Sequence, residues 1–327
     1  MRYSLLCCAL LSATPAAAGV EEALSDHILP GFAGFAEAAE ALAVTAEADC
    51  TAPALRRPWN ASFDAWTAIG DVRMGPSETG ALSVAFWPDA RGFTPKTLTR
   101  LISSQEEVGT DPGAFAEVSI AARGLFALER MLFDAEFSGY EAGSYACTLV
   151  QTMSADLANQ AQALEAGWRE GYADVLRSAG AEGNATYLSE DEALTALYTQ
   201  VLSSLEFTAD SRLGRPLGSF DRPRPTRAEA WRSERSLRNV RLYADAAGAF
   251  AHTLVDGELP LTEAALTRLH EVADRVADPA LQDIEDPSAR LRLEIVQQQV
   301  RALHDAIEQE VGVPLGLTPG FNSQDGD

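Results

Sequence analysis

The sequence has few of the residues, and none of the motifs, on which most catalytic and metal sites are built. Its 327 residues include four cysteines and four histidines. It contains no His-Glu-x-x-His segment, no phosphate-binding glycine loop, no Gly-x-Ser-x-Gly turn and no paired-cysteine metal motif. The histidines are spread along the chain, so only the fold could join them into a site: His27, His252, His270 and His304. These absences favour a binding or structural protein over an enzyme.

Segments in which apolar and polar residues alternate are also nearly absent, which argues against a β-sheet protein. Most long segments instead repeat apolar residues every three or four positions, which is the period of a helix. We therefore predict an all-α protein. The predicted helices include residues 20–49 with a kink at Pro30, residues 112–134, and a long helix over 140–179. Residues 70–94 lack this period, and we predict a long loop there.

Positive charge is scarce, and the formal net charge at pH 7 is −23. An acidic surface repels nucleic acids and anionic membranes, so we expect neither as a partner. Residues 211–227 are the exception, because they concentrate arginine. We favour the interpretation that these arginines tie the loop to acidic helices. The alternative is that they face an anionic ligand.

The N-terminus has the pattern of a secretory signal peptide. Arg2 precedes an apolar run over residues 5–11, and a small-residue cleavage site ends at Ala18. We therefore predict a signal peptide over residues 1–18 and export of the mature chain. A lipoprotein anchored through Cys7 or Cys8 is the weaker alternative, because these cysteines lie inside the apolar run. We predict no transmembrane segment, since no later segment is apolar for long enough.

Two cysteines remain after the predicted cleavage, Cys50 and Cys147. An even pair in an exported chain is most simply a disulfide. In the chain-entropy model, closing a loop of this length stabilises the fold by roughly 4 to 5 kcal/mol. The alternative, a pair of metal-binding thiolates, lacks the close cysteine spacing of zinc sites.

Glu129 is the most unusual residue of the predicted helix over 112–134. Its helical neighbours at three and four positions are all apolar: Leu125, Phe126, Leu132 and Phe133. A carboxylate buried there without partners would cost several kcal/mol or take up a proton, so Glu129 needs a cation or donors from elsewhere. The candidate cations are Arg73, Arg123, Arg232 and Arg235.

We hypothesise that Glu129 converges with Arg73 or Arg235 at an interface close to Trp87. The alternative is a buried ion pair that only fixes how the helices pack. Gly124 lies one turn before Glu129. A glycine inside a helix is usually tolerated where another backbone or a ligand comes close.

Several short motifs occur in one order along the chain. The segment over residues 124–129 resembles the Gly-x-His-x-x-Glu motif of the imelysin family of bacterial envelope proteins, with Phe126 in place of the histidine. Further matches are similar to a subgroup of imelysin-like, predicted periplasmic lipoproteins: Phe63-x-x-Trp66, Arg73-x-Gly75-Pro76, residues 86–89, residues 232–241 and residues 320–322.

The resemblance implies two related four-helix bundles with a functional pocket where they meet. We place bundle one at about residues 19–180, bundle two at about 189–312 and a C-terminal tail at 313–327. The resemblance also implies a periplasmic location and an association with iron uptake, with iron or another divalent metal as the expected cofactor. Phe126 removes the metal-binding imidazole from this motif. Our candidate binding residues are Glu129, Arg73, Trp87, Arg123, Arg235 and Ser236.

Three functions remain open. The leading one is a non-enzymatic periplasmic protein that binds a metal or small ligand, or assists an envelope iron-uptake protein, through the pocket between the bundles. The second is a metallopeptidase, which the family's peptidase name suggests, although no histidine-rich zinc motif is present. The third is a structural protein that docks to a membrane component through its acidic surface or its arginine loop.

Overall fold

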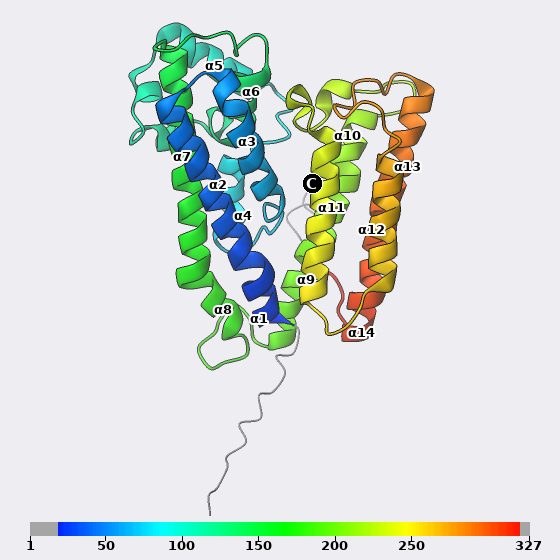
Figure 1. Cartoon of the computed structure of the whole chain (residues 1–327). Coiled ribbons are helices and arrows are strands. Elements are labelled where there is room, and N and C mark those ends of the chain that lie inside the picture. The colour runs from blue at the N-terminus through cyan, green and yellow to red at the C-terminus, as the bar shows by residue number, and fades with distance from the viewer. Residues whose placement is uncertain (1–18, 321–327) are drawn as a thin grey trace, which may run out of the picture.

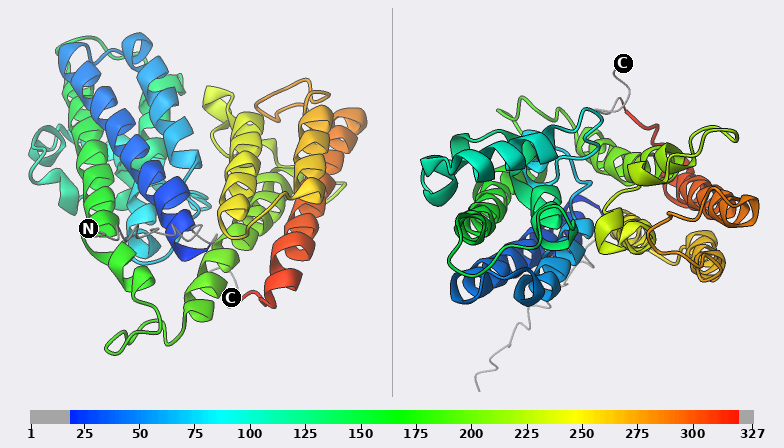
Figure 2. Two further views of the ribbon diagram at one scale, coloured as in Figure 1. Left: turned by 60° about the horizontal axis from the view of Figure 1, so that its bottom comes forward. Right: turned by 90° about the horizontal axis from the view of Figure 1, so that it is seen from above.

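The computed structural model describes residues 19–320. Over this range the chain forms α-, 3-10- and π-helices and no β-strand, which confirms the all-α prediction. The helices form two bundles that stand side by side (Figure 1), and the view from above shows the same separation (Figure 2). The predicted signal peptide at residues 1–18 lies outside the described residues.

Bundle one is built around four helices. Helix α2 packs against α3 and α7, and α6 packs against α3 and α7. Their bounds are Leu29–Ala48 for α2, Ala52–Thr67 for α3, Gly124–Phe133 for α6 and Tyr145–Gly167 for α7. Shorter helices complete this half: α1 (Val20–Glu22), η1 (Ala23–Ile28), α4 (Pro76–Val84), α5 (Phe93–Ser104), η2 (Glu107–Thr110), η3 (Phe115–Glu117), η4 (Ile120–Ala122), η5 (Trp168–Tyr172) and α8 (Ala173–Arg177).

Bundle two also has four main helices. Helix α11 packs against α9 and α12, and α13 packs against α12 and α9. Their bounds are Glu190–Phe207 for α9, Ser236–Thr253 for α11, Pro260–Ala273 for α12 and Pro287–Ile307 for α13. The shorter helices are η6 (Thr208–Leu213), α10 (Gly214–Leu217), η7 (Pro225–Arg227), η8 (Trp231–Ser233), η9 (Glu308–Gly312) and α14 (Val313–Leu315). The chain passes between the bundles after α8, and the residue limits that we assigned to each bundle stay a prediction.

The first run of helices, Val20–Ala48, is strongly apolar because it packs in the core of bundle one. By length and composition, Val20–Ala48 could cross a membrane, contrary to our expectation that no segment after the signal peptide is apolar enough. In the structure, Phe32, Phe35 and Leu42 of this run are fully buried. Its apolar character therefore has a sufficient explanation in packing against α3 and α7. A π-helical turn, η1, ends two residues before Pro30, and the kink expected at Pro30 stays a prediction.

Two sequence-based boundaries were wrong. The predicted loop over residues 70–94 contains the helix α4, whose glycine and small polar residues conceal the helical period. The predicted helix over 112–134 is shorter, because its first part forms 3-10 turns and α6 begins only at Gly124. Gly124 has a φ of 73°, in the left-handed region, so it starts the helix and does not lie inside it.

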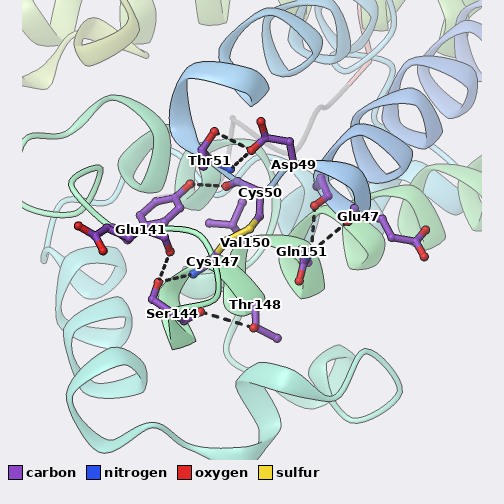
Figure 3. The surroundings of a disulfide bond; sticks show 12 residues. Glu47, Asp49, Cys50, Thr51, Glu141, Ser144, Cys147, Thr148, Val150 and Gln151 are labelled. Atoms are coloured by element: carbon purple, nitrogen blue, oxygen red, sulfur yellow. Dashed lines mark hydrogen bonds between the residues drawn. A yellow bond between two sulfur atoms is a disulfide. The ribbon is translucent and has the colours of Figure 1, made fainter.

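The disulfide prediction is confirmed. Cys50, just after α2, is bonded to Cys147 in the first turn of α7, and their Cα atoms lie 5.3 Å apart (Figure 3). Neighbouring hydrogen bonds join the same two segments. The Tyr140 hydroxyl donates to the carbonyl of Cys50 at 3.0 Å, and the Gln151 amide donates to that of Ala46 at 3.1 Å. The end of α2 is therefore fastened to the start of α7.

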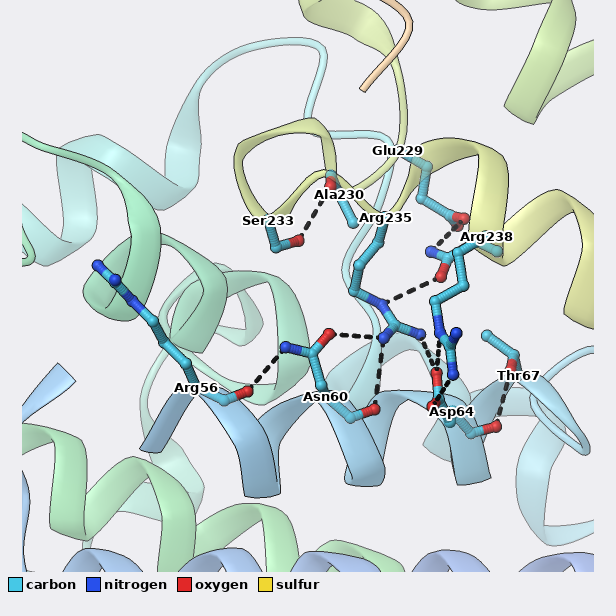
Figure 4. A network of polar contacts seen from close by, with 10 residues as sticks. Arg56, Asn60, Asp64, Thr67, Glu229, Ala230, Ser233, Arg235 and Arg238 are labelled. Carbon is cyan, nitrogen blue, oxygen red and sulfur yellow. Dashed lines mark hydrogen bonds and ion pairs between the residues drawn. The ribbon is translucent and has the colours of Figure 1, made fainter. Parts of the chain in front are cut away.

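The bundles meet through an interface of complementary charge, in which bundle one supplies carboxylates and bundle two supplies arginines. The pairs are Asp64 with Arg235 and Arg238, Asp71 with Arg212, and Asp134 with Arg232. Figure 4 shows Arg235 extending to α3, where it donates to Oδ1 of Asn60 at 2.7 Å and to Oδ1 of Asp64 at 2.5 Å. Arg235 is only 2% exposed, so this contact fixes how the bundles pack.

Candidate functional site

A pocket of about 120 Å³ lies where the two bundles meet. Bundle one contributes the loop after α4, with Trp87 and Asp89, and the face of α6 that carries Phe126 and Glu129. Bundle two contributes α10, η7, η8 and the residues between η7 and η8, and each of these three helices carries one arginine of the pocket: Arg215, Arg227 and Arg232. The volume is smaller than the roughly 300–1,000 Å³ of sites for drug-sized ligands, so the pocket suits a small molecule or one group of a larger one.

Glu129 lies in the wall of this pocket and is 3% exposed. One carboxylate oxygen, Oε1, accepts hydrogen bonds from the backbone N–H of Ser233 at 3.0 Å and from its hydroxyl at 2.8 Å. The donors that its burial required therefore come from bundle two. Among the described residues, no arginine forms an ion pair with Glu129, so the convergence with Arg73 or Arg235 that we hypothesised is not seen as a direct contact.

The electrostatic environment of Glu129 is set mainly by burial. Burial raises the pKa of Glu129 above its ordinary value, although the hydrogen bonds from Ser233 and the charges of Arg232 and Arg130 act in the opposite direction. Both arginines bond to the same oxygen of Asp134, Arg130 at 2.7 Å and Arg232 at 2.8 Å. Both arginines thus form their ion pairs with Asp134, and their electrostatic attraction to Glu129 is weaker than the effect of burial.

Arg215 and Arg227 differ from the other arginines of the pocket. Within residues 19–320, neither side chain forms an ion pair or a side-chain hydrogen bond, whereas Arg130 and Arg232 share Asp134. Burial, together with the charge of Arg227, lowers the pKa of Arg215, although its guanidinium stays protonated at neutral pH. The pocket therefore holds two cationic groups that the described protein leaves without a counter-charge.

The aromatic part of the pocket comes from both bundles. The ring of Trp87 is stacked against that of Phe126, with centroids 6.3 Å apart. From the other bundle comes Trp231, and the guanidinium of Arg232 lies 4.2 Å from its ring centroid. The indole N–H of Trp231 is buried and has no hydrogen-bond partner among the described residues. The pocket thus combines flat apolar surfaces with hydrogen-bond donors.

The short turn that carries Trp231 to the pocket is held in an unusual conformation. Ala230 and Glu234, on either side of η8, have φ values of 46° and 58°, in the left-handed region that residues with a Cβ rarely adopt. The N–H of Arg235 closes the turn by donating to the carbonyl of Ala230 at 3.1 Å. Such strain is often found at functional sites, where the surrounding structure maintains it.

Of the six candidate binding residues, Glu129 and Trp87 line this pocket and the other four do not. Arg73 lies over the ring of Phe207, and Arg123 makes two hydrogen bonds to Asp156, of 2.9 and 2.7 Å, inside bundle one. Arg235 belongs to the bundle interface described above. The hydroxyl of Ser236 donates to the carbonyl of Glu229 at 2.7 Å. These four residues are engaged by protein partners, and a ligand-binding role for any of the six stays a prediction.

The arginine loop over residues 211–227 divides between the two interpretations offered for it. Arg212 is 2% exposed and binds Asp71 and Glu229, as expected of an arginine that ties the loop to acidic groups. Arg215 and Arg227 line the pocket. Sequence reasoning identified the loop but did not assign its arginines to the site, because only the fold separates the paired ones from the unpaired ones.

The pocket does not fit a bare metal ion. Phe126, which replaces the motif histidine, is only 8% exposed and packs edge-on against Phe63 with centroids 5.4 Å apart. The pocket's two carboxylates already accept hydrogen bonds: Glu129 from Ser233, and Asp89 from the N–H groups of Phe93 and Thr94. Four nearby arginines also disfavour a cation.

The histidines do not contribute to this pocket. His27 stacks on Phe250, with ring centroids 4.5 Å apart, and burial lowers its pKa to about 4. His304 forms, with Asp305 and Glu308, the one group of potential metal ligands found among residues 19–320, and this group is on bundle two away from the pocket. Its two carboxylates are exposed, which is common without a bound metal.

Comparison with known proteins places the chain in a family. The family model of imelysin, also named peptidase M75, matches residues 28–307. No curated protein matches the chain. An imelysin-like protein from Psychrobacter arcticum has a similar structure, with a TM-score of 0.76 and 17% identity over 92% of this chain and 96% of its own. An iron-regulated protein A precursor from Parabacteroides distasonis also has a similar structure, with a TM-score of 0.71 and 15% identity over 92% of this chain and 97% of its own. The chain belongs to the imelysin family, and it shares the fold of these two proteins.

Proposed function

We propose that this protein is a non-enzymatic binding protein of the bacterial periplasm, which serves the acquisition of iron or another metal through the pocket between its bundles. The observation that carries the proposal is the composition of this pocket, to which both bundles contribute aromatic and charged side chains. The disulfide Cys50–Cys147 indicates an oxidising compartment, which supports the periplasm. The link to iron comes from the name of the Parabacteroides protein, whose fold is similar.

The test is to fill the pocket without disturbing the core. Ala90 is exposed and lines the pocket, so Ala90→Trp should obstruct it. Ala142 is also exposed but lies outside the pocket, and Ala142→Trp is the matched control. In a strain that lacks the gene and is starved of iron, we expect wild type and Ala142→Trp to restore uptake of radiolabelled iron. Ala90→Trp should not restore it, although both variants fold equally well.

Full restoration by Ala90→Trp would contradict a role for the pocket. Hydrolysis of peptides by the purified protein, lost on chelation, would instead support the metallopeptidase. Direct binding of ferrous or ferric iron in calorimetry needs a further control, because the surface group at His304 could capture a cation. Binding that His304→Ala abolishes belongs to that surface group, whereas binding that only Ala90→Trp abolishes belongs to the pocket.

A further inference from the structure

The pocket between the bundles has more hydrogen-bond donors and more positive charges than the described residues pair with acceptors and negative charges. Asp89 and Glu129 are its acidic lining residues, and both already accept hydrogen bonds from protein groups. Arg130 and Arg232 are paired with Asp134. Among residues 19–320, Arg215 and Arg227 have no ion pair and no side-chain hydrogen bond, and their like charges repel. A bound anion would remove this repulsion.

We infer that the pocket binds a small carboxylate-bearing molecule, with the carboxylate held by Arg215 and Arg227 and the body of the molecule against Trp87 and Trp231. This inference rests on the proposed function and specifies the ligand that the pocket takes.

The geometry favours a carboxylate over other small ligands. A guanidinium group presents N–H donors in a planar fork that matches the two oxygens of a carboxylate. The tryptophans offer flat surfaces for an organic body, which inorganic phosphate lacks. The volume of about 120 Å³ is too small for a macrocycle such as haem.

The inference also bears on how a metal would reach this protein. A bare cation meets four arginines in the pocket, whereas a metal already held by carboxylates arrives in an anionic complex. The positive charge would then attract the complex through its free carboxylate oxygens. Metal ligation would come from the small molecule, so the pocket would need no imidazole at Phe126.

The experiment is calorimetry on the mature protein with citrate, benzoate and inorganic phosphate as separate probes, read in parallel by tryptophan fluorescence. We expect at least one of the two carboxylates to bind more tightly than phosphate, and added salt to weaken the binding. Arg215→Gln and Arg227→Gln should each weaken it by about tenfold or more. Lysine at either position should restore part of the affinity.

The matched control is Arg222→Gln, which removes an exposed arginine of the same loop that lies outside the pocket. This variant should bind like wild type. An equal loss in Arg222→Gln would show that the loop acts only through its general charge and would overturn the inference. Equal or tighter binding of phosphate, or no binding of either carboxylate, would also overturn it.

The two proposals can fail separately. If Ala90→Trp abolishes iron uptake while both arginine variants support it fully, the pocket functions but does not use the carboxylate site. If citrate or benzoate binds through Arg215 and Arg227 but Ala90→Trp leaves iron uptake intact, the carboxylate site is real and the role in iron acquisition is wrong.

Discussion

Burial makes the charge of Glu129 a cost to the folded protein. Because its pKa is raised, Glu129 favours folding below its ordinary pKa, and this contribution is lost as the pH rises through the folded value. Glutamine keeps an oxygen that can accept the Ser233 hydrogen bonds but carries no charge. We therefore expect Glu129→Gln to equal or exceed wild type in free energy of unfolding at pH 7, and to lose this advantage near pH 4.

The comparison variant for this prediction is Glu129→Ala, which removes the acceptor as well as the charge. It leaves the N–H of Ser233 unpaired in a partly buried site and should cost about 2 to 4 kcal/mol. Urea unfolding at pH 4 and pH 7 measures all three proteins. Equal losses in the glutamine and alanine variants at pH 7 would show that the negative charge itself stabilises the fold.

Gly124 is required by both its conformation and its surroundings. A Cβ atom there would lie 2.1 Å from the carbonyl oxygen of Val84 and 2.4 Å from that of Ser83, and φ is 73°. We predict that Gly124→Ala lowers the free energy of unfolding by more than about 2 kcal/mol, because strain and a clash with backbone act together.

Gly34 provides the control for this substitution. It lies exposed within α2, and an added Cβ would have no neighbour within 4 Å. Gly34→Ala should stabilise the protein by about 0.5 to 1 kcal/mol, the usual difference in helix propensity. Thermal and urea unfolding of both variants measure the contrast, and a harmless Gly124→Ala would mean that α4 and α6 do not approach as closely as the structure shows.

At the same scale, the sequence predicted that Glu129 is buried and needs partners, because its apolar neighbours recur at helical spacing. It did not predict Ser233 as the partner. The need for donors is met by a hydroxyl and a backbone N–H, whereas the only residues that the sequence analysis names as candidates are arginines. Sequence spacing shows that a side chain requires donors, whereas the donors come from a turn 104 residues away that only the fold brings close.

Among the elements, the disulfide joins the end of α2 to the start of α7 across 97 residues. We predict that replacing both Cys50 and Cys147 by alanine lowers the free energy of unfolding by about 4 kcal/mol in the chain-entropy model. Urea unfolding with and without a reductant measures the effect. Reduced wild type should match the double variant, and the reductant should not change the variant. Equal stability of the oxidised and reduced wild type would contradict a stabilising role.

Helices with a clear apolar stripe were predictable, and those set by turn geometry were not. The run from α7 through α8 kept its helical period despite the π-turn η5, and the sequence identified it as one long helix. Helix α4 was not predicted, because its glycine and small polar residues interrupt the helical repeat of apolar residues. The start of α6 was not predicted, because the positions of the apolar residues after Gly124 are the same whether Gly124 begins the helix or lies inside it.

For the molecule as a whole, the fold was predictable, and two of the six candidate site residues, Glu129 and Trp87, line the pocket. The apolar periods and the resemblance indicated two helical bundles. A pocket lies where the two bundles meet, and its function stays a proposal. Its unpaired arginines, however, become recognisable only when Arg212 of the same loop is seen bound to Asp71 and Glu229. Which arginines have no ion-pair partner depends on tertiary contacts, and the neighbouring residues in the sequence do not indicate these contacts.

The charge-complementary interface between the bundles should make the packing of the bundles sensitive to acid. Burial alone would raise the pKa of Asp64, but hydrogen bonds from Arg238 and Arg235 hold it below its ordinary value. For Asp71, the charge and hydrogen bonds of Arg212 likewise outweigh burial. A carboxyl with a lowered pKa stabilises the fold above its ordinary pKa of 3.8, and this contribution is lost as the pH falls through the folded value. We therefore expect the interface to weaken below about pH 4.

Asp64→Asn tests this coupling between the bundles at neutral pH. The variant leaves the buried Arg235 without its carboxylate, so we expect a loss of about 3 kcal/mol and faster amide exchange in α3 and α11, the helices that meet there. The matched control is Asp210→Asn, which breaks the exposed ion pair with Arg301 inside bundle two and should cost less than about 1 kcal/mol. Because Asp64→Asn has already lost a titrating group, its stability should also fall less steeply than that of wild type below pH 4. Equal effects of the two variants would mean that the bundles are held together by apolar packing and that the interfacial charges only set their register.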